Sequence, residues 1–469
     1  MDASAKRYRR AIEAKIMLDP DIESIRISIA VCVAAYLVLL WVLRRDSVSL
    51  GLPFAYLSLL FLNHVPGAYV QLADDLFNGH RHEIEIGIRL TAIGAVCFVV
   101  GVWLARAYTA EARANPVQST SVAWFEDDKP FWIFCFLGGM LFSFGLAPLR
   151  NLPSIGAVVY NGGALWMLGV LLGLRAAIRK HDRKWIAIWA SLLVIYPTLI
   201  LVTTGFLSYG TAAVILVVSA LAISARNYWR VVITIVLTVY LGLSVFSNYF
   251  EARDNIRDVV WTSYSTEKRV DAISKIFADF RFFDGTDELV LVGFDLRLNQ
   301  NYFIGLASEN IDSGSVHYLY GRSISDALLA LIPRAIWSEK TVYGGSPDIV
   351  RDMTGLWLNP DTSWGVGNVM EFYINFGIPG LVAGFLGLGW LIGRFDHRAA
   401  LAEARRDYGT TMLFFLPGIA LIQPLGSMVE LSGGAATAWI AAHFWKWVWA
   451  HLGVRGRSDA ALAQDQTAQ

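Results

Sequence analysis

The chain has 469 residues, of which 55% are hydrophobic and only 17% are charged. These proportions, together with 17 Trp, exclude an ordinary soluble domain and indicate a protein that crosses a membrane several times. The 39 basic and 39 acidic residues cancel, so charge becomes informative only when it is assigned to individual loops. No nucleic-acid partner is expected.

All three cysteines lie inside apolar runs, where a thiol behaves as a small hydrophobic group. Cys32, Cys97 and Cys135 therefore indicate neither a disulfide framework nor a zinc site. The first 25 residues are too charged for the apolar core of a signal peptide, so we expect the first apolar run to be retained as an anchor.

A helix that spans a membrane needs about 20 mostly apolar residues. Such segments are predicted at 26–43, 50–66, 89–106, 131–147, 155–174, 185–203, 207–224, 230–248, 372–393, 410–427 and 433–451. The predicted fold is therefore an all-α polytopic membrane protein with about 11 (10–13) transmembrane helices and one long extracytoplasmic loop containing short interfacial helices. The chain divides into an amino-terminal helix bundle (1–248), a long periplasmic loop (249–371) and carboxyl-terminal helices with a cytoplasmic tail (372–469).

Basic residues in short loops predict the orientation, because they resist translocation. Basic stretches at 175–184, 226–230, 394–406 and 455–457 alternate correctly if all of them face the cytoplasm. The long insertion is then outside, as are residues 63–85, the turn near Arg150 and the link at Gly205. Counting back puts the basic amino terminus outside as well. Either two early helices are misread, which we favour, or residues 1–25 form an amphipathic surface helix.

The long insertion is acidic overall. Residues 249–371 contain 11 basic and 18 acidic side chains, a net charge of −7, so a phosphate site there needs a local arginine cluster. Arg253 and Arg257 are four apart and share one face if the preceding helix continues past the bilayer. They could clamp a lipid diphosphate by bidentate hydrogen bonds. A salt-bridged helix end with Asp254 and Asp258 is the alternative.

A second cluster follows Gly321. Its apolar part is too short to span a membrane, so it is predicted to form an interfacial helix that begins with Arg322 and ends at Pro333. Arg334 would then lie at the membrane surface, with Lys340 as a second cation and Trp337 as an interface anchor. Arginine snorkelling to lipid headgroups is the structural alternative.

A third group surrounds the entry to the helix near residue 372. Asn368, Glu371 and Asn375 are polar residues at a depth where an ionisable group is costly. Glu371 is the first candidate for a general base, although it could also cap its own helix. His317 and Asp326 are further candidates, and a lone histidine such as His317 is more often simply packed.

Other features are less specific. Asp74 and Asp75, near His80 and His82, lack the ligand spacing of a metal site, so no metal and no cofactor are expected. Aromatic residues are dense in the insertion and could line a glycan groove, with Trp337, Tyr343 and Asn375 as candidates, or form the core of the loop or an interface belt. Glycines 205, 210, 433 and 434 are predicted to be close-packing points between helices.

These residues resemble a known family. The pattern Pro333-Arg334-x-x-Trp337-x-x-Lys340, followed by Gly367-x-x-x-Glu371-x-x-x-Asn375-x-Gly377-x-x-Gly380, looks like the bacterial Wzy-type O-antigen and oligosaccharide repeat-unit polymerases. A long periplasmic loop late in a chain of ten to fourteen helices is also similar to that family. The likeness covers about residues 249–381 and the hydropathy profile.

The resemblance implies an enzyme of the bacterial inner membrane that joins undecaprenyl-diphosphate-linked oligosaccharide units into O-antigen or exopolysaccharide. Its partners would be that lipid-linked substrate, membrane lipids, a chain-length regulator and a flippase. In this interpretation Arg253, Arg257, Arg322, Arg334 and Lys340 would bind diphosphate, and Glu371 would activate the acceptor hydroxyl.

Three alternatives stay open. An O-antigen ligase uses the same chemistry with a different acceptor. Another transferase could use a polyprenyl-phosphate sugar, with Asp74 and Asp75 as the base. A transporter of lipid-linked glycans would favour charges within its helices and an internal two-fold repeat, and neither is evident in the sequence.

Overall fold

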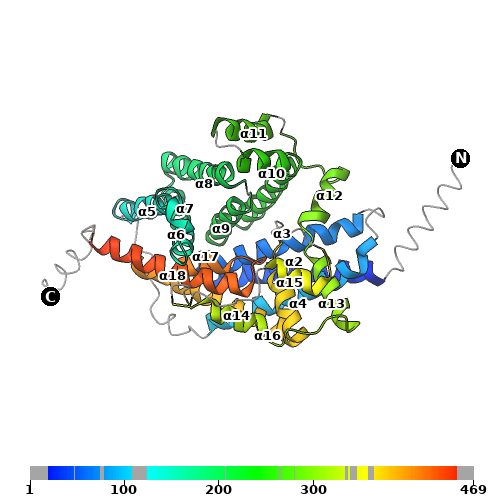
Figure 1. Cartoon of the computed structure of the whole chain (residues 1–469). Coiled ribbons are helices and arrows are strands. Elements are labelled where there is room, and N and C mark those ends of the chain that lie inside the picture. Colours follow the sequence, from blue (N-terminus) through cyan, green and yellow to red (C-terminus); the bar gives the residue numbers. More distant parts are fainter. Residues whose placement is uncertain are drawn as a thin grey trace.

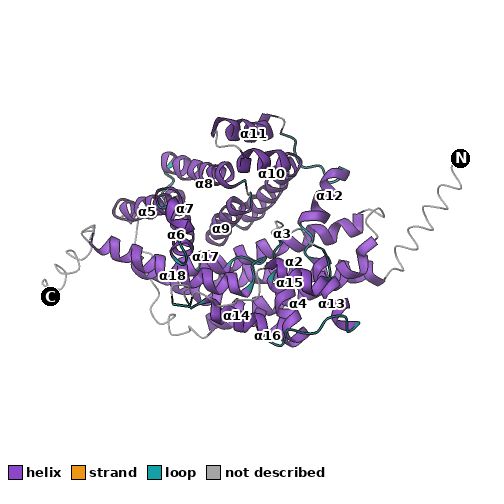
Figure 2. Cartoon of the chain, in the orientation of Figure 1, coloured by secondary structure: helices purple, strands orange, loops and turns teal. Residues whose placement is uncertain are grey.

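The computed structural model describes residues 20–46, 48–73, 79–107, 124–205, 207–225, 227–262, 266–278, 280–332, 336–337, 346–357 and 364–451 (Figure 1). Within these residues the regular structure is entirely helical, with no strand (Figure 2). The predicted all-α class is therefore confirmed.

Six of the described helical segments are long and apolar enough to cross a membrane, by length and composition. They are Pro20–Arg45, Arg81–Ala107, Ile155–Arg179, Arg183–Thr203, Val231–Val260 and Asn368–Ala404. The other five predicted segments also coincide with helices, namely α3 (Leu52–Ala73), α5 (Trp124–Met140), α9 (Ser208–Ser224), α17 (Tyr408–Leu421) and α18 (Met428–His451). These five do not meet the same criterion, so the predicted total of about 11 spans is not confirmed.

The centre of the molecule is the packing of α4 (Arg81–Ala107) against α16 (Asn368–Ala404). Glycines allow the two backbones to approach closely. A methyl group on Gly101 would lie 2.3 Å from Leu386 O, and one on Gly389 would lie 2.2 Å from Phe98 O. Figure 1 shows both helices on the side of the molecule opposite α8 (Arg183–Thr204) and α11 (Thr266–Ala278).

Small residues and prolines break several predicted helices. The segment predicted at 155–174 is divided into α6 (Ile155–Gly162) and α7 (Leu165–Arg179), with Gly163 at the break. After α5 the chain forms a π-helix, Leu141–Gly145, and a 3-10 helix, Ala147–Asn151. The turn predicted near Arg150 is therefore present.

The long insertion contains several short helices, one of them near the position predicted after Gly321. α10 (Tyr228–Thr262) continues past the predicted boundary at 248, so Arg253 and Arg257 do lie on one helix. It is followed by α11, α12 (Glu288–Arg297), α13 (Asn301–Asp312), α14 (Arg322–Ala330) and α15 (Ser346–Thr354). In Figure 1, α10 and α11 lie above the α4–α16 layer, whereas α14 lies beside α16 at the level of that layer.

Segments predicted to share one side of the membrane contact one another. The Gln300 amide in the insertion donates to Asn63 O, at 3.0 Å, in the early loop that is also predicted outside. On the other side, Arg175 lies 3.9 Å from Glu403, and both belong to predicted cytoplasmic regions. Helices occupy all three early predicted segments, as α2 (Pro20–Asp46), α3 and α4, but of these only α2 and α4 contain a segment that meets the spanning criterion.

Candidate functional site

An arginine cluster lies where α10 passes α12. Arg253 and Arg257 on α10 lie close enough to Arg297, at the end of α12, for their charges to act on it. Burial lowers the pKa of Arg297, and the positive charges of Arg253 and Arg257 lower it further. Arg253 lies 3.3 Å from Asp254, whose side chain is 95% exposed, so water strongly screens that ion pair. The cluster therefore concentrates positive charge at one place on an acidic insertion.

Arg297 connects this cluster to the segment that precedes α16. Its guanidinium lies 5.3 Å from the ring centre of Trp364, within the range of a cation–π contact. The next residue, Gly365, packs directly on Leu425, since a methyl group there would lie 2.4 Å from Leu425 O. The arginine cluster thus borders the contact between residues 364–371 and the loop before α18.

That contact is a hydrogen-bonded junction between two segments far apart in the sequence. The amide of Gly367 donates to Leu425 O at 3.1 Å, and the amide of Asn368 donates to Pro424 O at 2.9 Å. The Asn368 side chain donates to Gly426 O at 2.9 Å and accepts from the Tyr56 hydroxyl at 2.8 Å. We call residues 364–371 and 421–428 together the junction. Asn368, singled out in the sequence, fixes its geometry.

Glu371 lies at the buried end of the junction and bonds it to α18. The residue is completely buried, and its Oε2 accepts a hydrogen bond of 2.6 Å from the amide of Met428, the first residue of α18. The Ser323 hydroxyl also lies beside this carboxyl group. Glu371 therefore does act as a helix cap, but it caps α18 and not, as the alternative interpretation proposed, the helix that contains it.

Glu430 is a second carboxylate at the junction, and sequence reasoning missed it. Its Oε2 accepts from the Ser427 amide at 2.8 Å, while the Glu430 amide donates to the Ser427 hydroxyl at 3.2 Å. This reciprocal pair is a capping box, which the Ser427-x-x-Glu430 spacing could have indicated. Ser346 also donates to Oε2, at 3.3 Å. The side chain of Glu430 is exposed, unlike that of Glu371.

Asn375 and α14 pack beside Glu371 on the buried side of the junction. Asn375 donates to the Ser323 hydroxyl at 2.8 Å and accepts from the Gly321 amide at 3.0 Å. α14 begins at this contact, and Asp326, one turn further on, is buried. Burial raises the pKa of Asp326, and the charge of Arg322 partly opposes that shift. Asn375 therefore acts in the structure as a link between α14 and α16.

An open pocket of about 500 Å³, which we call the cavity, lies beside the junction, between α6 and the first turns of α18. Glu430 lines it, together with Gln423 from the junction. From the other side it is lined by Arg150, Tyr160 and Asn161. The turn near Arg150 and the start of α18, which are both predicted outside the membrane, thus meet at one cavity.

The remaining predicted site residues lie in different places. Arg334, Lys340 and Tyr343 lie outside the described residues, as do Asp74 and Asp75. His317 and Arg322 are exposed, and Trp337 is 47% exposed. Glu371, Asn375, Arg322 and Asp326 come together around α14, whereas Arg253 and Arg257 lie apart from them on α10.

Sequence reasoning also missed Arg297 as a site residue, because it belongs to no local motif, and it included Trp364 only among the aromatic residues that could line a glycan groove. Their contact joins positions 67 residues apart. The glycine prediction was partly wrong. A methyl group on Gly210 would lie 2.5 Å from Pro197 Cβ, as expected of a packing point, but one on Gly433 would meet open space.

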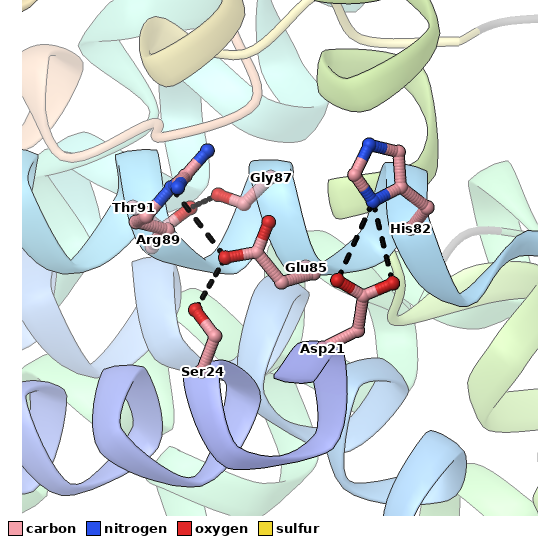
Figure 3. A network of polar contacts seen from close by, with 7 residues as sticks. All are labelled: Asp21, Ser24, His82, Glu85, Gly87, Arg89 and Thr91. Carbon is pink, nitrogen blue, oxygen red and sulfur yellow. Dashed lines mark hydrogen bonds and ion pairs between the residues drawn. The ribbon is translucent and has the colours of Figure 1, made fainter. Parts of the chain in front are cut away.

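A separate polar network joins α2 to α4 (Figure 3). His82 Nδ1 lies 3.3 Å from Asp21, and Glu85 contacts the Ser24 hydroxyl. The potential metal-ligating atoms of Asp21, His82 and Glu85 lie within 4.8 Å of one another, a spacing that could hold a cation. Arg89, however, pairs with Glu85 at 3.5 Å, and its positive charge disfavours a cation there. The network instead anchors the beginning of α2 beside α4.

Comparisons of the chain with models of known families, with curated proteins and with solved structures find no match. Structure and composition together define a membrane-embedded helical protein with a polar junction on one face of its central helix layer.

Proposed function

We propose that the chain is a multi-pass glycosyltransferase of the bacterial inner membrane that polymerises lipid-diphosphate-linked oligosaccharide repeat units at the outer face. The junction carries this proposal. It connects the arginine cluster, through Arg297 and Trp364, to the cavity lined by Glu430. Cations for a diphosphate and a carboxylate for an acceptor hydroxyl thus border one hydrogen-bonded unit.

The proposed orientation has independent support from the contacts between loops. The insertion contacts the loop at 63–85, where a methyl group on Gly305 would lie 2.1 Å from Glu83 O. Tyr249 donates to Gly205 O at 2.8 Å, which joins α10 to another link predicted outside. Arg175 and Glu403, which lie 3.9 Å apart, belong to two of the basic stretches that the positive-inside rule assigns to the cytoplasm.

In the proposed reaction, the oxygen of an acceptor sugar hydroxyl attacks the anomeric carbon of the sugar attached to the lipid diphosphate. A new carbon–oxygen bond forms, the bond from that carbon to the diphosphate oxygen breaks, and the lipid diphosphate leaves with the electron pair. A carboxylate takes the proton of the hydroxyl and returns it to water. The guanidiniums of Arg253, Arg257 and Arg297 stabilise the negative charge on the leaving group.

Of the two carboxylates, Glu430 is the better candidate for the base. Its side chain lines the cavity, and the hydrogen bonds from Ser346 and from the Ser427 amide both use Oε2 rather than Oε1. Glu371, the base that the sequence favoured, has no exposed surface. We assign Glu371 the positioning of α18, which carries Glu430.

Deletion of the gene in its host, followed by gel analysis of the surface glycan, tests the proposed function. We expect single repeat units on the carrier or on its final lipid acceptor, because transfer between units would stop. Long chains that remain on the carrier would indicate a ligase instead. A normal chain-length distribution would contradict both activities.

A further inference from the structure

We infer that the cavity between α6 and α18 is a subsite for an uncharged pyranose sugar at the acceptor end of the glycan. Its volume of about 500 Å³ lies within the range of about 300–1,000 Å³ that is common for small-molecule sites. The identity of this sugar as the acceptor rests on the proposed function, whereas the inference that the cavity binds a sugar is independent of it.

The polar wall has the chemistry that recognises neighbouring hydroxyl groups. Asn161 on α6 and Gln423 in the junction each provide a planar amide; Gln423 offers donors and an acceptor, whereas Asn161 offers its Oδ1 acceptor because its two N–H donors are used within the protein. The Asn161 amide donates to the Thr437 hydroxyl at 2.9 Å and to Ala157 O at 3.0 Å. These bonds hold the amide in one orientation before a ligand arrives, which reduces the entropy cost of binding.

The charges of the wall favour a neutral ligand. Arg150 and Glu430 are the charged residues among those that line the cavity, and their charges cancel. Arg150 is held in place, since it donates to Ser143 O at 2.7 Å. A diphosphate would meet the carboxylate of Glu430, so it belongs to the arginine cluster at Arg297 instead.

Part of the cavity suits the apolar face of a sugar ring. Tyr160 is 47% exposed there and presents an aromatic surface to C–H groups. The α18 wall contains Gly433, where a methyl group would meet nothing within 4 Å. A ring can therefore approach the α18 backbone closely. These features distinguish the cavity from a gap filled by side chains.

The position of Glu430 relates this subsite to the proposed reaction. Glu430 lines the cavity and also closes the first turn of α18 through Ser427. A sugar held by Asn161 and Gln423 would present its hydroxyls along the same wall as the carboxylate. The cavity therefore supplies the acceptor, and the arginine cluster supplies the donor, from two sides of the junction.

A cavity-blocking variant tests the inference in the purified full-length protein in lipid nanodiscs. Gly433→Phe places a ring in open space within the cavity, and Gly387→Phe on α16 is the matched control, because Gly387 also has no neighbour within 4 Å but does not line the cavity. The probe is the oligosaccharide released by mild acid from the host's own lipid-linked glycan and labelled at its reducing end.

We expect the unmodified protein and Gly387→Phe to bind the probe and Gly433→Phe to lose binding, with equal melting temperatures. Gln423→Ala, at an exposed loop position, should weaken binding by about tenfold, which is the loss of one hydrogen bond to a buried hydroxyl. Equal binding by all variants, or no binding by any, would overturn the subsite. If the subsite is real but the gene deletion leaves chain length normal, only the proposed polymerase function fails.

Discussion

At the scale of single residues, the two carboxylates of the junction differ in accessibility rather than in type. Glu371 and Glu430 both stabilise the first turn of α18, one through the Met428 amide and the other through the Ser427 amide. Glu371 is completely enclosed, whereas Glu430 borders a cavity. A proton acceptor must lie within hydrogen-bond reach of the acceptor hydroxyl, and accessibility therefore favours Glu430.

Replacement by glutamine separates the two roles. Glu430→Gln keeps an acceptor oxygen for the cap but removes the base, so we expect the rate of glycosyl transfer at saturating acceptor to fall by about 10²–10⁴-fold with little change in melting temperature. Glu371→Gln should keep most of this rate, because the Met428 amide retains an acceptor. A larger loss of rate in Glu371→Gln than in Glu430→Gln would return the role of base to Glu371.

The arginine cluster gives a second prediction. Arg297→Ala removes a guanidinium from a partly buried site beside Trp364, and we expect weaker binding of the lipid-diphosphate donor. Arg297→Lys should recover little, because an ammonium ion cannot bind diphosphate in a bidentate manner. Arg351→Ala, at a surface pair with Asp348, is the control. The KM for the lipid-diphosphate donor, measured for the three variants, shows whether Arg297 binds the donor. An unchanged KM in Arg297→Ala would remove that residue from the site.

Local patterns in the sequence reveal only some of these residues. Arg253 and Arg257 could be predicted as neighbours because a helical spacing of four puts them on one face. Arg297 joins them only through the packing of α12 on α10, which no local pattern encodes. Glu430 was recognisable as half of a capping box, but its place in a cavity depends on α6, more than 260 residues earlier.

At the scale of elements, hydropathy predicts helix positions well and helix continuity poorly. All the predicted apolar segments coincide with helices, yet the segment predicted at 155–174 is broken next to Gly163. α16 contains a similar break, where Phe376 and Gly377 leave the helical conformation just before Pro379. The break comes directly after Asn375, which bonds α14, so the part of α16 that contacts the site ends there.

Gly377 is the residue on which that break depends. Its φ of 66° and ψ of −147° lie close to a region that is essentially restricted to glycine. We expect Gly377→Ala to cost about 1–3 kcal/mol and to lower the melting temperature. Gly387→Ala in the regular part of the same helix has open space and should be neutral or stabilise the protein by up to about 1 kcal/mol. Thermal unfolding in one detergent compares the two, and equal melting temperatures would show that the break tolerates a side chain.

At the scale of the whole molecule, long-range contacts sort the chain into two faces. Asp21, in the first turn of α2, lies beside His82, and near the other end of this helix Arg44 donates to Ala222 O at 3.1 Å. The His82 region is the loop predicted outside, and Ala222 precedes a stretch predicted in the cytoplasm. These two contacts are those expected if an uninterrupted count of the predicted segments holds, which would put the beginning of α2 outside.

Cysteine labelling tests this arrangement of faces. Starting from a variant in which Cys32, Cys97 and Cys135 are replaced by serine or alanine, single cysteines are introduced at Gly79 and Ser313 on one face and at Lys180 on the other. We expect a membrane-impermeant maleimide to label the first two in intact cells and Lys180→Cys only after permeabilisation, because opposite ends of the helices lie in different compartments.

Agreement between positions 79 and 313 is the decisive part of that experiment. If they label together, the loop that carries His82 and the insertion that carries the arginine cluster occupy one compartment, as the hydrogen bond from Gln300 to Asn63 requires. If both label only after permeabilisation, the junction faces the cytoplasm, where a periplasmic polymerase could not act. Opposite labelling of the two positions would contradict the fold itself, since their surroundings are in direct contact.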